Sequence, residues 1–141
     1  MHRHAPPFHR SLWAFAAAAL VGTLITDIAY WRSAQMMWAD FSAWLLAIGL
    51  VMGGLAAVAG LIDFFGNRLI RTQTPVWPHM VGNIAVLLLA LLNSFVHTRD
   101  AWTSVVPLGL TLSLITVLIL PVTGWLGWAM VYRHGVGASR S

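Results

Sequence analysis

The sequence has 141 residues, of which 59% are hydrophobic and 9% are charged. Soluble domains carry about 25% charged residues, so this composition excludes an ordinary soluble domain and is typical of a membrane protein. The chain contains no cysteine, which excludes disulfides and cysteine-ligated iron–sulfur clusters. Its net charge of +4 comes from arginines dispersed at the ends of apolar runs, and this pattern argues against nucleic-acid binding.

Four stretches reach the roughly 20 mostly apolar residues that a helix needs to cross a bilayer: 11–31, 41–65, 78–97 and 103–132. The connectors between them are short and leave no room for a soluble domain. We therefore expect residues 1–141 to form one transmembrane domain, an all-α integral membrane four-helix bundle with up-down-up-down connectivity.

The first span carries one carboxylate, Asp27, near its outer end. This residue and the following "AYWRSAQ" are a poor match to a signal-peptide cleavage site, so the span is interpreted as an uncleaved helix. Pairing with Arg32 or Arg99 is the expected role of Asp27, and a part in transport is the alternative.

The second span carries a seam of small residues on one helical face that ends in a carboxylate: Gly49, Gly53, Ala56, Gly60 and Asp63. Such a seam lets helix backbones approach closely in lipid. Because a carboxylate is unfavourable at a helix C-terminus, we expect Asp63 to have a partner, namely Arg68, Arg71 or a histidine.

The third span carries a partly polar stripe at steps of four and three residues: His79, Asn83, Val86, Ala90, Asn93 and His97. The two asparagines are expected to bond to neighbouring helices. His97 is interpreted as an interfacial residue, whereas His79 leads the stripe at the inner surface.

The fourth span contains Pro121, followed by Gly124 and Gly127. The proline should kink the helix, with Thr116, Thr123 or a neighbouring helix satisfying the freed carbonyl.

The arginines predict the orientation. Six of them (3, 10, 68, 71, 133 and 140) fall on the side of the two termini, against Arg32 and Arg99 on the other. The positive-inside rule therefore places both termini in the cytoplasm, and the expected location is the bacterial cytoplasmic membrane.

This topology brings one polar side chain from each helix to the cytoplasmic end: His9, Asp63, His79 and His134. Three histidines and an aspartate suit zinc, copper or iron. Alternatively, His79 and His134, with Asn83 nearby, could hold haem b between apolar helix faces.

Several motifs resemble a known family, the small bacterial membrane proteins of domain-of-unknown-function family 2231. "GWLGWAMVYRHGVG" at 124–137 resembles its C-terminal block, "AGLIDFFG" at 59–66 the end of its second helix, and "HMVGN" at 79–83 the start of its third. "HAPPFHRSL" at 4–12 keeps the histidines of its N-terminal motif but lacks its second proline. The resemblance implies a four-helix membrane protein whose motif histidines lie together.

Three functions are compatible with these features. The first is a redox or metal-binding bundle, and the second is a non-catalytic scaffold or accessory subunit that packs on a membrane protein partner, or on a second copy, through the glycine seam. The third is a small transporter using Asp27 and Asp63. No catalytic motif is present, so at most an electron-transfer component is expected rather than an enzyme.

Overall fold

The computed structural model describes residues 8–72, 76–98 and 105–132, and within these ranges it contains helices and no strands. The four long helices are α1 (Phe8–Ser33), α2 (Met36–Gly66), α4 (Val76–His97) and α6 (Leu108–Tyr132); the single-turn helix α3 (Arg68–Arg71) follows α2. Each long helix contains a segment that is long and apolar enough to cross a membrane. The predicted all-α membrane bundle is confirmed.

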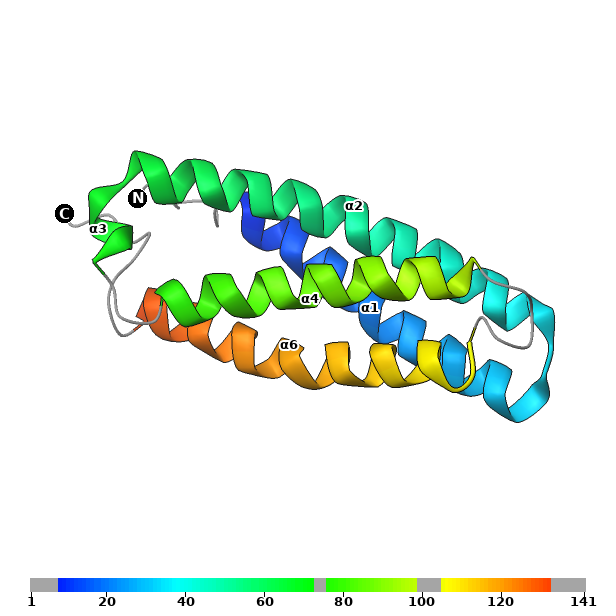
Figure 1. Cartoon of the computed structure of the whole chain (residues 1–141). Helices are drawn as coiled ribbons and strands as arrows, with labels where there is room; N and C mark the ends of the chain where they lie inside the picture. Colours follow the sequence, from blue (N-terminus) through cyan, green and yellow to red (C-terminus); the bar gives the residue numbers. More distant parts are fainter. Residues whose placement is uncertain (1–7, 73–75, 99–104, 133–141) are drawn as a thin grey trace, which may run out of the picture.

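The long helices lie side by side and alternate in direction (Figure 1). The most extensive contacts join α1 to α2 and α4 to α6, while contacts of α2 with α4 and of α1 with α6 close the bundle. The start of α1, the end of α2, the start of α4 and the end of α6 share one end of the bundle, which we call the proximal end. The opposite end is the distal end.

Two helix starts differ from the predicted positions by five residues, while the other boundaries agree to within three. Helix α2 begins at Met36 rather than at residue 41, because a tight reversal at Ala34 follows α1 directly. Ala34 has a φ of 55°, and its N–H donates to the Tyr30 carbonyl at 2.7 Å, which is a common way to end a helix. Helix α6 begins at Leu108 rather than at 103, immediately after Pro107.

Ala34→Gly is expected to raise the free energy of unfolding by about 1 kcal/mol, because glycine adopts a left-handed backbone without the steric cost of a Cβ. Thermal unfolding of the detergent-solubilised protein measures this. The matched control is Ala18→Gly in the exposed middle of α1, which should lower stability by about 0.5–1 kcal/mol. Equal losses in both variants would contradict the prediction.

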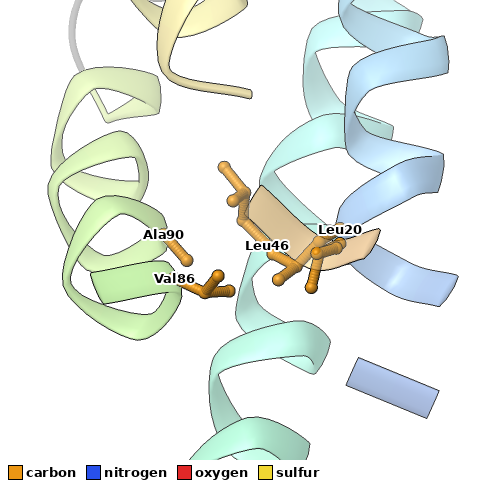
Figure 2. Close-up of a cluster of buried hydrophobic side chains, with 5 residues drawn as sticks. Leu20, Leu46, Val86 and Ala90 are labelled. Atoms are coloured by element: carbon orange, nitrogen blue, oxygen red, sulfur yellow. The ribbon is translucent and has the colours of Figure 1, made fainter. Parts of the chain in front are cut away.

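Many large apolar side chains lie on the outer surface of the bundle, as expected for a surface that faces lipid. Phe15, Trp44 and Phe65 are among those exposed. The central core contains one or two residues from each long helix: Leu20, Leu46, Val86, Ala90 and Leu120, most of which are labelled in Figure 2.

The first part of the glycine seam of α2 packs inside the bundle, as its spacing predicted, whereas at Gly60 a Cβ would meet nothing within 4 Å among the described residues. A Cβ at Gly49 would lie 3.0 Å from Leu20 Cδ2, and one at Gly53 would lie 2.6 Å from Leu87 Cδ2. These two glycines are therefore covered by α1 and α4. A partner therefore cannot pack against Gly49 or Gly53, because the chain's own helices occupy that part of the seam.

Helix α6 continues through Pro121. The Thr123 hydroxyl donates to the Leu120 carbonyl at 3.0 Å, and the Thr116 hydroxyl donates to the Leu112 carbonyl at 2.8 Å. The prediction that one of these threonines satisfies the carbonyl freed by the proline is wrong, because each bonds one turn behind itself.

Candidate functional site

An Asp–His pair lies buried between three helices in the distal half of the bundle. His97 Nε2 of α4 is 2.9 Å from Asp27 Oδ1 of α1, and the two side chains are 1% and 0% exposed. Ionisable groups are rare within membrane spans because hydrocarbon disfavours charge. The hydrogen-bond partners of this pair therefore indicate its role.

The orientation of the His97 ring fixes how many protons the pair holds. Nδ1 is 3.0 Å from the Asn93 carbonyl, which can only accept, so Nδ1 carries a proton and donates it. The contact between Nε2 and Asp27 Oδ1 then requires one further proton, because two lone pairs would otherwise face each other. That proton resides either on Nε2, beside a carboxylate, or on the carboxyl group, beside a neutral imidazole.

The second carboxylate oxygen binds a hydroxyl from α6. Ser113 Oγ donates to Asp27 Oδ2 at 2.5 Å, and Asn93 Nδ2 donates to Ser113 Oγ at 2.7 Å. The chain Asn93–Ser113–Asp27–His97 returns to Asn93 through its backbone carbonyl, so α1, α4 and α6 are tied by one closed network. Asn93 Oδ1 is buried and has no partner among the described residues.

The local sequence explains this convergence. Asn93 and His97 are one helical turn apart on the polar stripe of α4, and Ser113 projects from the neighbouring α6. Beside the network, Thr26 and Ser42 join α1 to α2 through hydroxyls 2.6 Å apart. The distal half of the bundle therefore contains polar contacts made by all four long helices.

The structure corrects two interpretations drawn from the sequence. Asp27 pairs with His97 and Ser113 rather than with Arg32, which is exposed, while Arg99 lies outside the described residues. His97 is a buried partner of that carboxylate and not merely an interfacial residue. The signal available in the sequence was the presence of polar residues within the apolar helices at a similar depth, among them Asp27, Asn93 and Ser113.

At the proximal end, the predicted site residue His79 is held by α6. Its Nδ1 donates to the Thr123 carbonyl at 2.8 Å, and Asn83 Nδ2 donates to its Nε2 at 3.2 Å. The tautomer is therefore the one with the proton on Nδ1. Asn83 Oδ1 is buried and without a partner among the described residues.

Two glycines permit this contact between α4 and α6. A Cβ at Gly127 would lie 2.8 Å from His79 Cε1, so the ring rests on the bare backbone of α6. A Cβ at Gly82 would overlap the Thr123 methyl group. Gly127 of the C-terminal motif thus has a definite structural role, because its missing side chain makes room for the His79 ring.

Gly127→Ala is expected to displace the His79 ring and lengthen its bond to the Thr123 carbonyl, at a cost of about 1–3 kcal/mol in stability. The matched control is Gly124→Ala on the same helix, where a Cβ meets nothing within 4 Å among the described residues. That change should be neutral or stabilising, because alanine favours helix. Thermal unfolding and the ¹⁵N signals of His79 measure both variants, and identical behaviour would contradict the role of Gly127.

The four predicted metal ligands are only partly described. Asp63 is exposed in the last turn of α2, where its backbone carbonyl accepts the Asn67 N–H at 3.0 Å. His9 falls in the first turn of α1 with its side chain outside the described part, and His134 lies beyond it. No group of three or more potential metal ligands occurs among the residues that the structure describes.

Comparison with known proteins agrees with the architecture. The family model described as "Predicted membrane protein (DUF2231)" matches residues 5–140, nearly the whole chain. Comparisons with curated proteins and with solved structures give no match. The match spans all four long helices and the motifs at 59–66, 79–83 and 124–137 that carried the resemblance. The chain therefore belongs to the DUF2231 family of membrane proteins.

Proposed function

We propose that this protein binds and releases a proton inside the membrane, with Asp27 and His97 as the proton-binding pair. The observation that carries the proposal is the contact of 2.9 Å between His97 Nε2 and Asp27 Oδ1 in a fully buried setting. Because His97 Nδ1 is committed to a carbonyl, the proton between these two atoms is the one that can leave.

Two physical arguments support this assignment over a purely structural one. A buried ion pair seldom stabilises a fold more than apolar residues of the same volume would, so packing alone does not favour it. Ionisable groups within membrane spans also concentrate on proton and ion pathways. The other titratable groups of the described distal half are Tyr30, Arg32 and Asp40; the latter two are exposed and Tyr30 is buried on α1.

The arginine distribution supports an orientation in which the proximal end faces the cytoplasm of a bacterial cell. The Asp27–His97 pair then belongs to the outer half of the cytoplasmic membrane. In that position it can exchange its proton with the outer side, which suits a proton-coupled or proton-sensing membrane component rather than an enzyme.

The test is ¹⁵N NMR of histidine-labelled protein in lipid nanodiscs at a series of pH values. The His97 signals should shift with pH in the natural protein. In Asp27→Asn the introduced amide donates to Nε2, so His97 should stay neutral throughout. A titration curve that is flat in the natural protein, or identical in the variant, would overturn the proposal.

A second proposal concerns the proximal end, where haem b or a transition metal (zinc, copper or iron) would bind through His79 and His134, with His9 and Asp63 completing a metal site. The supporting observation is that His79 Nδ1 donates to a backbone carbonyl, as ligating histidines commonly do to orient Nε2. Binding would replace the bond of 3.2 Å from Asn83.

This second proposal is tested by the absorption spectrum and metal content of the purified protein. A Soret band or stoichiometric metal that disappears in His79→Gln supports it. A spectrum without such a band, together with an empty metal analysis, contradicts it.

A further inference from the structure

The α4–α6 interface is polar at both ends and apolar in the middle. At the proximal end, His79 contacts Thr123 and is bonded to Asn83; in the distal half, Asn93 contacts Ser113. Asn83 and Asn93 are ten residues apart on one helix, which corresponds to about 15 Å of rise. The two polar clusters thus share one interface at different membrane depths.

Each cluster contains a buried hydrogen-bond acceptor without a partner among the described residues. The two atoms are Asn83 Oδ1 and Asn93 Oδ1. An unpaired buried acceptor is costly, and internal water is the usual way in which proteins satisfy one. Asn83 is one hydrogen bond from His79, and Asn93 is linked to Asp27 through Ser113. Both acceptors therefore lie within hydrogen-bond chains that end at a titratable group.

An apolar layer separates the clusters. It is formed by Val86 and Ala90 of α4 and Leu120 of α6, with Leu20 and Leu46 at the same level (Figure 2). These side chains are almost completely buried. Pro121, next to Leu120, has no N–H and leaves the Val117 carbonyl without its helical donor at this level. Polar backbone therefore lies beside the apolar layer.

We propose that the α4–α6 interface is a proton path across the membrane, composed of the two polar clusters and interrupted by this apolar layer. The inference rests on the proposed function of the Asp27–His97 pair and adds a route and an activity to it. Protons reach Asp27 and His97 from the distal side, and water admitted to the apolar layer would carry them to Asn83 and His79. No covalent step is involved.

The experiment uses the full chain in liposomes that contain a pH-sensitive dye, with a pH gradient imposed and valinomycin present to compensate charge. Val86→Ser replaces an apolar side chain of the layer by a smaller one with a hydroxyl, which gives water both room and a partner. Proton flux should rise by at least about tenfold, the effect of lowering a barrier by about 1.4 kcal/mol. Ala90→Ser is the milder second variant should Val86→Ser fail to fold.

The matched control is Val81→Ser on the same helix, where the side chain is 64% exposed and faces lipid. It should leave the flux unchanged. Adding Asp27→Asn to Val86→Ser should return the flux to the natural level. A rise that survives Asp27→Asn, or folded layer variants without any rise, would overturn the path. If His97 nevertheless titrates by NMR, only the path fails; if His97 does not titrate, the proposed function itself fails.

Discussion

Asp27→Ala is expected to lower the free energy of unfolding by about 3–5 kcal/mol, the range found when one member of a buried charged pair is removed. The truncation takes away the partner of His97 Nε2 and the acceptor of the Ser113 hydroxyl at once. Both groups are enclosed by α1, α4 and α6, so lipid cannot replace the lost bonds. Reversible unfolding in mixed detergent micelles measures the loss.

Asp27→Asn should behave differently, within about 1 kcal/mol of the natural protein. The amide nitrogen can donate to His97 Nε2, while the amide oxygen accepts from Ser113, so every hydrogen bond of the network is retained with His97 neutral. This contrast between two substitutions at one position separates charge from packing. It also makes Asp27→Asn the suitable variant for proton measurements, since the fold should be kept while the carboxyl group is lost.

Two further variants provide reference values for the stability loss of Asp27→Ala. Ser113→Ala removes one bond to the carboxylate and leaves Asn93 Nδ2 without its acceptor, which should cost about 1–3 kcal/mol. Asp40→Ala on the exposed start of α2 should change stability by less than about 0.5 kcal/mol. If Asp27→Asn were as damaging as Asp27→Ala, the inference that the network tolerates a neutral pair would be contradicted.

The architecture could be predicted from the sequence because bilayer thickness sets the length and composition of each span. Helix α4 ends at His97 as predicted, and the inward position of Gly49 and Gly53 followed from their spacing. The chain reversal at Ala34 could not be predicted from the sequence, because alanine seldom adopts a positive φ and its presence does not indicate a turn.

The candidate site was less predictable, since its contacts join different helices. The i, i+4 relation of His79 and Asn83 was visible in the stripe, and the structure links them at 3.2 Å. The pairing of Asp27 with His97 spans 70 positions and depends on the rotation of α1 against α4, which periodicity does not determine. An arginine near the helix end was the expected partner of the carboxylate. Because Asp27 is buried, however, its partner is a side chain that points into the bundle from another helix.

Gly82→Ala is expected to disturb the contact between α4 and α6. The added Cβ would overlap the Thr123 methyl group, which is the end of a short branched side chain whose hydroxyl is bonded to the Leu120 carbonyl at 3.0 Å. Since this side chain has little freedom to turn away, α4 and α6 must separate locally. We expect a loss of about 1–3 kcal/mol in stability, as for overpacked cores, together with a weaker bond from His79 to the Thr123 carbonyl.

A second substitution at Thr123 should suppress the effect of Gly82→Ala. Thr123→Ser removes the methyl group and keeps the hydroxyl, so the double variant Gly82→Ala with Thr123→Ser should recover most of the loss, giving an interaction free energy of about 1 kcal/mol or more in the double-mutant cycle. Gly54→Ala is the control, because a Cβ there meets nothing within 4 Å among the described residues, and it should be neutral or slightly stabilising. Additive effects of the two substitutions would show that α4 and α6 do not meet at Gly82 and Thr123. Recovery of both stability and the His79 signals would establish that this one close approach sets the position of the proximal histidine.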